Sequence, residues 1–313
     1  MRVPLRQPIV SAAREALSWL PALGVIDGAR RPWGISAIVR VKDEETWLEP
    51  SIRSIATVAD AIIVADNGSE DRTPEILAAL RAALGERLTV LDRPGLDIRD
   101  LTNGLIERSR FRWIIRWDAD FVAHTEGPRA VSHVRDWLAT LGARRPVMAY
   151  LRMVELCGDL FHQRSHTVSR ADCHAFSASP RLRYVYDANG YEAPAVPPWY
   201  RVRRFDVPTF FHVDVKPARR MFLSWLWKRY LLEPRRATWP GFDAYLAHEL
   251  ETRWAGASVE AAARRWWPTA FSDLVPYDRE RFGEYPALLR GYLERPAFRV
   301  LTRDDAIVGR TEP

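Results

Sequence analysis

The chain has 313 residues, of which 47% are hydrophobic, 27% charged and 11% aromatic. This composition excludes a disordered chain and a collagen-like repeat, and two cysteines, Cys157 and Cys173, are too few for a disulfide scaffold. The net charge of +6, with histidine neutral, suits an anionic ligand but equally a solvated basic surface. The length suits one large domain with appendages, or two domains.

The sequence carries no signal for a membrane-spanning helix, because no uninterrupted apolar stretch reaches about 18 residues. Residues 1–23 contain an apolar stretch that Arg14 and Glu15 interrupt, and no clean cleavage site for a signal peptide follows. We interpret this segment as an additional helix and expect a cytoplasmic protein. Lysines and arginines are dispersed and no nucleic-acid-binding motif is present, so we expect no nucleic-acid partner.

Strand and helix signals alternate from residue 33 onward. The β-branched run ISAIVRV (35–41) predicts a strand buried on both faces, and residues 46–58 carry apolar side chains at helical spacing. Further strands are predicted at 61–65, 88–91 and 113–117, and helices at 73–84 and 101–109. This alternation predicts an α/β fold with a doubly wound, mostly parallel sheet.

The pattern is looser after residue 120. We expect helices at 127–141, 221–232, 242–254 and 259–267, and strands at 147–153, 183–186 and 209–213. The expected organisation is an N-terminal helical extension (1–32), an α/β half (33–153), a second half of the same domain (154–216) and a helical C-terminal region (217–313).

Acidic residues follow three of the predicted strands. Asp43 and Glu44 follow the first strand, Asp66 the second, and Asp118 with Asp120 the fourth. In an open parallel sheet, ligands bind beyond the carboxyl ends of the strands, so these acids are candidates for a binding site. Aspartate also starts turns readily, which explains any one of these positions without a ligand.

The run Asp118-Ala119-Asp120 is the most informative of these patterns. Alternate residues leaving a strand project the same way, and two neighbouring carboxylates repel each other unless a cation lies with them. Hard oxygen ligands select Mg²⁺ or Mn²⁺, and these ions in turn bind a diphosphate. The sequence therefore predicts Mn²⁺ or Mg²⁺ at this pair.

Three motifs follow one another in residues 35–123: ISAIVRV with KDEE after it, AIIVADNGSEDRT, and WIIRWDAD. Together they resemble the nucleotide-binding half of the family 2 glycosyltransferases of the GT-A fold. The resemblance implies an inverting enzyme that moves a sugar from a nucleoside diphosphate sugar, UDP-linked by preference, to a small-molecule, glycan or lipid-linked acceptor. The run Arg40-Val41-Lys42-Asp43 departs from the Pro or Asn of many members, which leaves the choice of nucleotide open.

The resemblance also implies roles for single residues. The backbone at Val39 and Val41 and the carboxylate of Glu44 would line the nucleoside pocket. Asp66, with Asn67 beside it, would accept a hydrogen bond from the base, which suits an ionised carboxylate facing an imide N–H.

The same resemblance places Asp118 at the ribose and the metal, and Asp120 at the metal. Some GT-A members supply a late histidine as a further metal ligand, and His212 is the candidate here. A lone histidine is also commonly a hydrogen-bonded core residue, and that alternative stays open.

A sugar acceptor must lose a proton, and in the family a carboxylate from the C-terminal half acts as the base. Glu192, Asp187 and Asp172 are the candidates. We favour Glu192, because some relatives carry a His-Glu dipeptide in a comparable place. The alternative is that Glu192 is an exposed loop acid.

Residues 217–236 contain the segment MFLSWLWKRYLL between pairs of arginines. Such a segment is compatible with peripheral contact to an anionic membrane, and equally with a helix packed on the sheet. Two other functions fit parts of the sequence. A sugar nucleotidyltransferase is disfavoured because residues 40–45 contain no glycine to hold a triphosphate, and a non-catalytic nucleotide-sugar or carbohydrate binder stays open.

Overall fold

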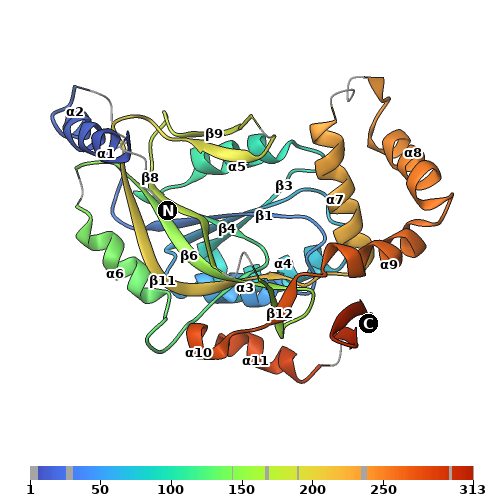
Figure 1. Ribbon diagram of the computed structural model, residues 1–313. Coiled ribbons are helices and arrows are strands. Elements are labelled where there is room, and N and C mark those ends of the chain that lie inside the picture. Colours follow the sequence, from blue (N-terminus) through green and yellow to red (C-terminus); the bar gives the residue numbers. More distant parts are fainter. Residues whose placement is uncertain are drawn as a thin grey trace.

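The computed structural model describes residues 6–25, 31–142, 144–165, 169–188, 190–233, 238–295 and 298–312. Its centre is an eight-stranded sheet that crosses the molecule (Figure 1). In spatial order the strands are β3 (Leu88–Asp92), β2 (Ala61–Asp66), β1 (Ile35–Val41), β4 (Trp113–Asp118), β8 (Ser169–Ser177), β6 (Val147–Cys157), β11 (Arg201–Asp214) and β5 (Phe121–Ala123).

The first four of these strands pair in parallel, as the sequence predicts. Strand β8 is antiparallel to both β4 and β6, β6 is parallel to β11, and β11 is antiparallel to β5. The predicted α/β fold with a mostly parallel sheet is confirmed. The sequence analysis missed β8 and β5, because β8 mixes polar and apolar residues and β5 is only three residues long.

Helices cover both faces of the sheet (Figure 1). On one face lie α3 (Leu48–Ile55), α4 (Thr73–Leu84) and α6 (Ser132–Thr140), and on the other lies α5 (Ile98–Arg108). Strand β1 serves both cores because successive side chains alternate between faces: Ala37 and Val39 pack with the first group and Ile38 with the second. Helix α5 begins at a cap, where the carboxylate of Asp97 accepts a hydrogen bond from the Arg99 amide at 3.0 Å.

Three of the C-terminal helices gather at one end of the sheet, away from the N-terminal helices (Figure 1). Helices α7 (Ala218–Leu232), α8 (Phe242–Trp254) and α9 (Val259–Ala270) share one aromatic core. The remaining elements are α1 (Arg6–Leu17), α2 (Trp19–Ala22), η1 (Gly85–Arg87), β7 (His162–Arg164), β9 (Arg183–Tyr186), β10 (Glu192–Ala195), β12 (Leu274–Pro276), α10 (Arg279–Phe282), α11 (Ala287–Leu293), β13 (Val300–Arg303) and β14 (Ala306–Arg310).

Several boundaries differ from the predictions in an informative way. Glu192, for which an exposed loop position was the alternative to a role as the base, opens strand β10, which pairs with β9. His212 lies inside β11, a strand of 14 residues that is much longer than the strand predicted at 209–213. Strands from 33–153 and from 154–216 share the central sheet, as expected for two halves of one domain, and the four-part division stays a prediction. Across the described ranges, we find no helix that combines the length and the apolar character needed to span a bilayer.

Candidate active site

The carboxyl ends of β1, β2 and β4 lie side by side at one edge of the sheet. The parallel register pairs Val41 with Asp66 and Arg40 with Asp118. The acids that the sequence places after separate strands therefore meet at one edge, which is where open α/β sheets bind ligands.

The turn after β2 braces the loop after β1. Oδ1 of Asp66 accepts hydrogen bonds from the Ser69 amide at 3.0 Å and the Ser69 hydroxyl at 2.7 Å. The amide of Asp43 donates to Ser69 Oγ, and the amide of Glu44 donates to the Thr73 hydroxyl, both at 2.8 Å. Part of the DNGSEDRT motif thus serves to hold Glu44 in place.

The other residues predicted to bind the nucleoside have structural contacts of their own. Val39 is fully buried within β1, and the carbonyl of Val41 accepts a hydrogen bond from the Asn67 amide at 2.9 Å. The Asn67 side chain bonds to both backbone groups of Leu96, at 3.0 and 3.1 Å. Asp66 additionally lines a cavity of about 890 Å³ beside α4 and β3.

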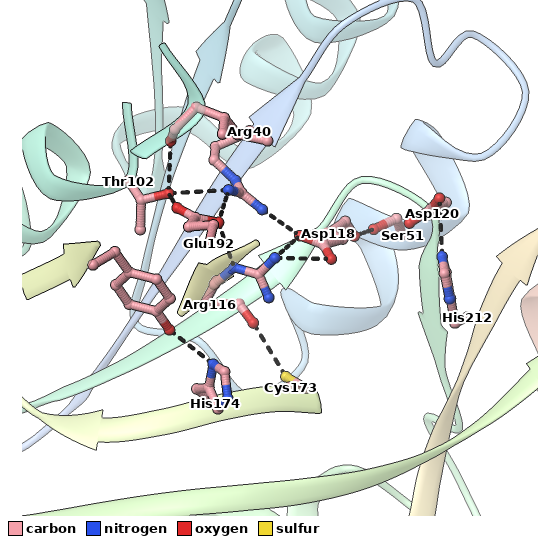
Figure 2. A network of polar contacts seen from close by, with 12 residues as sticks. Arg40, Ser51, Thr102, Arg116, Asp118, Asp120, Cys173, His174, Glu192 and His212 are labelled. Atoms are coloured by element: carbon pink, nitrogen blue, oxygen red, sulfur yellow. Dashed lines mark hydrogen bonds and ion pairs between the residues drawn. The ribbon is translucent and has the colours of Figure 1, made fainter. Parts of the chain in front are cut away.

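Asp118 lies in a group that we call the arginine cluster, formed with Arg40, Arg116, Glu192 and Thr102 (Figure 2). Asp118 Oδ1 lies 3.0 Å from Arg40 Nη2 and 3.3 Å from Arg116 Nη2. Glu192 forms an ion pair with Arg40, lies 3.7 Å from Arg116 Nε, and accepts a hydrogen bond from the Thr102 hydroxyl. Burial opposes ionisation of Asp118, but the two guanidinium groups outweigh it and lower the pKa of Asp118.

Asp120 belongs to a second group, the lysine cluster, which consists of Glu44, Asp120, His212, Lys216 and Arg220. Lys216 Nζ lies 2.5 Å from Asp120 Oδ2 and 3.2 Å from Glu44 Oε2. Arg220 Nη2 lies 2.8 Å from the same Glu44 oxygen, and His212 Nε2 lies 3.4 Å from Asp120 Oδ2. The Asp120 and Glu44 side chains are only 7% and 4% exposed, so their charges are compensated within the protein.

The charges of Asp120, His212 and Lys216 sustain one another, whereas burial outweighs the nearby cations at Glu44 and raises the pKa of its carboxyl. Burial opposes ionisation of Asp120, but Lys216 and His212 lower the pKa of its carboxyl well below the ordinary value. Burial likewise disfavours the imidazolium, yet Asp120 raises the pKa of His212 to about 9. The pKa of Lys216 is raised because Asp120 and Glu44 outweigh its burial. At neutral pH, Asp120 is therefore ionised and both of its partners are cationic.

The C-terminal hairpin of β13 and β14 holds Lys216 in position. Lys216 lies between the end of β11 and the start of α7. The guanidinium of Arg310 donates hydrogen bonds to the Lys216 carbonyl and, at 2.7 Å, to the Gly158 carbonyl. The Ala218 amide donates to Glu312 Oε1 at 3.2 Å. The lysine is thus fixed from both sides by backbone contacts.

Asp118 and Asp120 do not jointly face one cation site. They face different partners because the chain turns between β4 and β5 (Figure 2). Among the described residues no three His, Cys, Asp or Glu side chains converge as metal ligands. A divalent ion at Asp120 would have to displace the Lys216 ammonium. The side chains in this arrangement therefore do not fit the predicted Mn²⁺ or Mg²⁺, and the protein's own cations compensate the acids.

A cavity of about 550 Å³ opens beside the lysine cluster, between the end of β11, α7 and α9. Asp214, the last residue of β11, lines it together with Lys216 and Arg220. In the described part of the chain, the Asp214 carboxylate has one side-chain hydrogen bond, from the thiol of Cys157 at 3.9 Å, and it interacts electrostatically with His212 and Lys216. An acid with free oxygens beside the lysine cluster can accept a proton from a ligand in this cavity.

The three predicted bases lie in different surroundings. Glu192 is 7% exposed, and hydrogen bonds or ion pairs occupy both of its carboxylate oxygens. Asp187 is exposed on a turn, where it accepts a hydrogen bond from the Tyr191 amide at 2.9 Å. Asp172 lies in β8, and its side chain is outside the described residues. Asp214 was not among the candidates, although the carboxyl-end rule applied to the last strand points to it.

The cations of the site were also missed, although the sequence carries signals for them. Arg116 precedes Asp118 by two residues and therefore projects from the same face of β4. Lys216 and Arg220 directly precede the helix predicted at 221–232, next to the strand predicted at 209–213. The sequence gives no signal that Lys216 pairs with Asp120 and Glu44, which lie far earlier in the chain.

The protein thus has an α/β fold whose sheet edge gathers paired acids and cations beside a cavity. Residues 36–134 match the model of the family "Glycosyl transferase family 2". Residues 36–134 therefore form a family 2 glycosyltransferase region, in agreement with the resemblance.

One similar solved structure is S. aureus TarS 1-349 in complex with UDP-GlcNAc, which is 12% identical in sequence. The match covers 88% of this chain and 95% of that chain, with a TM-score of 0.43. Another is the mannosyltransferase PcManGT from Pyrobaculum calidifontis in complex with GDP-Man and Mn²⁺, with 14% identity, 84% and 92% covered, and a TM-score of 0.40. No curated protein matches the chain.

Proposed function

We propose that this protein transfers a sugar from a nucleoside diphosphate sugar, UDP-linked by preference, to an acceptor hydroxyl with inversion at the anomeric carbon. The observation that carries the proposal is the lysine cluster, which lies at the carboxyl edge of the family-matched strands and adjoins a cavity lined by Asp214. Asp66, at the end of β2, is the proposed partner of the nucleobase.

Sugar transfer from such a donor leaves a nucleoside diphosphate on which negative charge grows as the C1–O bond breaks. Cations fixed near that position before the reaction lower the barrier, because they need no reorganisation when the charge develops. We assign this role to Lys216 and Arg220. Both are held in place by Glu44, and Arg220 additionally by the carbonyls of Lys42 and Asp43.

The acceptor hydroxyl must lose its proton as it attacks C1 from the face opposite the leaving group. We propose Asp214 as the base, because its carboxylate faces the cavity and has free oxygens in the described structure. Glu192, Asp187 and Asp172 remain alternative bases that mutation can separate from Asp214.

The predicted Mn²⁺ or Mg²⁺ is not part of the proposed mechanism. Asp120 and His212 are adjacent and carry ligand atoms that Mn²⁺ or Mg²⁺ accepts, whereas Asp118 is paired with Arg40 and Arg116. Because the arrangement does not fit a divalent ion, no step of the proposed mechanism depends on one.

Membrane contact through residues 217–236 also remains a proposal. Within α7, Trp227 and Leu232 are 45% and 47% exposed, while Met221 and Phe222 pack into the aromatic core. Exposed apolar groups on a basic helix support contact with an anionic surface. Flotation with vesicles that contain phosphatidylserine, compared with neutral vesicles, tests it.

The proposed function is tested with a panel of UDP-, GDP- and dTDP-sugars, each with and without Mn²⁺. We expect the true donor to raise the melting temperature, because it binds only the folded state. We also expect slow release of the nucleoside diphosphate, which a non-catalytic binder does not produce. A donor that stabilises the protein without any release over days would support the binder instead.

A further inference from the structure

The cavity beside the lysine cluster is strongly cationic. Four basic side chains line it, Arg164, Lys216, Arg220 and Lys228, against the single carboxylate of Asp214. Arg164 is paired with Asp273 at 2.7 Å, and Lys216 and Arg220 with Glu44. The described residues offer Lys228 neither a hydrogen-bond nor an ion-pair partner. One cation on the cavity wall is therefore available to a ligand.

Helix α7 arranges its part of the lining as a row. Arg220, Ser224 and Lys228 are spaced four residues apart, so they lie along one face of the helix. With a rise of about 1.5 Å per residue, the row spans roughly 12 Å from the first to the last. Asp214 and Lys216 lie at the end near the sheet, and Lys228 at the far end, where it is exposed.

The wall contributed by α9 is aromatic. Trp266 and Phe271 line the cavity opposite α7, and the ring of Trp225 lies 5.5 Å from that of Trp266. Trp225 is half-buried, so part of its ring surface faces the cavity. Trp266 and Phe271 are 8% and 2% exposed and the Phe271 ring is covered by Arg164, so the sugar contact falls to the half-buried Trp225, while the basic row offers an anion its counter-charges.

We propose that this cavity is the acceptor site and that it takes a sugar bearing a phosphate group, with the sugar hydroxyl at Asp214 and the phosphate at Lys228. This inference rests on the proposed function and adds the chemical class of the acceptor. The phosphate is either that of a free sugar phosphate or the link to a lipid. In the second case the lipid leaves past Lys228, toward the exposed Trp227 and Leu232.

The test uses the full chain with UDP at saturation, so that the donor phosphate position is filled. The intrinsic tryptophan fluorescence is titrated with glucose 1-phosphate, with methyl glucoside as the neutral counterpart, and with a polyprenyl-phosphate-linked glucose in detergent micelles. We expect saturable quenching by a phosphorylated probe and at least tenfold weaker binding of methyl glucoside. Stronger binding of the micellar probe identifies the lipid source, and stronger binding of glucose 1-phosphate identifies the free one.

The matched variants are Lys228→Ala and Arg219→Ala, which remove one cation each from the same helix. Arg219 does not line the cavity; it is exposed and paired with Glu260 at 3.1 Å. We expect Lys228→Ala to lower the affinity for the phosphorylated probe about tenfold. Lys228→Arg should restore most of this affinity, and Arg219→Ala should leave it unchanged. Equal binding of the phosphorylated and neutral probes, or no effect of Lys228→Ala, would overturn the proposal.

Failure of the acceptor inference is separable from failure of the proposed function. Donor hydrolysis needs no acceptor, so hydrolysis without selective phosphate binding rejects only the acceptor class. Selective phosphate binding without any donor hydrolysis retains the cavity as a phosphosugar site and rejects the transferase.

Discussion

The ammonium of Lys216 lies 2.5 Å from the carboxylate of Asp120, and the two residues come from elements that are 96 positions apart in the chain. Lys216 bridges Asp120 to Glu44, which follows the first strand of the sheet. One lysine thus neutralises the acids of two strand ends, in the place where the sequence predicts a metal ion.

This pairing predicts strong coupling between the two residues. Lys216→Met leaves two buried carboxylates short of a cation, and Asp120→Asn leaves the lysine with Glu44 alone. We expect each single variant to lower the free energy of unfolding by about 3 kcal/mol, as for other broken buried ion pairs. The double variant should lose clearly less stability than the sum of the two single losses. Urea unfolding of the wild type, both single variants and the double variant measures these losses. Additive losses would show that the pair is not formed.

The same pairing predicts how the protein responds to Mn²⁺. In the wild type the ammonium occupies the position between Asp120 and Glu44. In Lys216→Met that position is open, and oxygen ligands of like charge attract a divalent ion. We expect millimolar Mn²⁺ to raise the melting temperature of Lys216→Met more than that of the wild type. An equal or larger rise in the wild type would instead support the metal predicted from the sequence.

The assignment of the base makes opposite predictions for two carboxylates. Asp214→Asn should lower the turnover number at least a hundredfold while donor affinity and stability stay near wild type, because the amide cannot accept the proton. Glu192→Gln should mainly destabilise, by about 3 kcal/mol, because Arg40 and Arg116 lose a buried partner. Turnover and urea unfolding are measured for both. Loss of turnover confined to Glu192→Gln, with full stability, would restore Glu192 as the base.

Asp66 has two roles that one substitution can separate. Its Oδ1 caps the turn through Ser69, and the proposal adds a hydrogen bond to the nucleobase. Asp66→Asn retains a carbonyl oxygen for the turn but removes the negative charge. We expect unchanged stability and about tenfold weaker binding of UDP, measured by calorimetry. Asp66→Ala, the control, should lose both stability and affinity.

A buried histidine makes stability depend on pH. His174 lies beneath the arginine cluster, with Nδ1 2.9 Å from the Tyr184 hydroxyl, and burial, aided by Arg116, lowers its pKa to about 3. The unfolded chain takes up a proton near pH 6.5 that the folded one refuses. The contribution of neutral His174 to the free energy of unfolding is therefore complete above pH 6.5. Below pH 6.5 this contribution falls by about 1.4 kcal/mol per pH unit, until the pH reaches the pKa of His174 in the folded protein.

His174→Gln tests this dependence directly. Between pH 7 and pH 5, its free energy of unfolding should decline less than that of the wild type. At pH 5 the two declines should differ by about 2 kcal/mol. The difference between the two curves is the measurement, because carboxylates lower the stability of both proteins in acid. Parallel curves would show that His174 is accessible to protons in the folded state.

The sequence by itself determined the sheet and the position of its acids. The strand at 35–41 and the helices at 73–84 and 242–254 have the predicted bounds, because local apolar spacing and turn residues specify them. The order of strands and acids also placed Asp66 and Asp118 at one edge, since parallel strands end on the same side.

Only the tertiary structure decided which charges meet. Lys216 reaches Asp120 because β11 ends beside β5 and the C-terminal hairpin holds the lysine, and neither contact leaves a periodic signal in the sequence. Likewise, Asp118 turns to Arg40 because of the register of β4 on β1. Ion pairing acts between residues that folding brings within a few ångströms, so it is specified by long-range packing, whereas strands and helices are specified by neighbours in the chain.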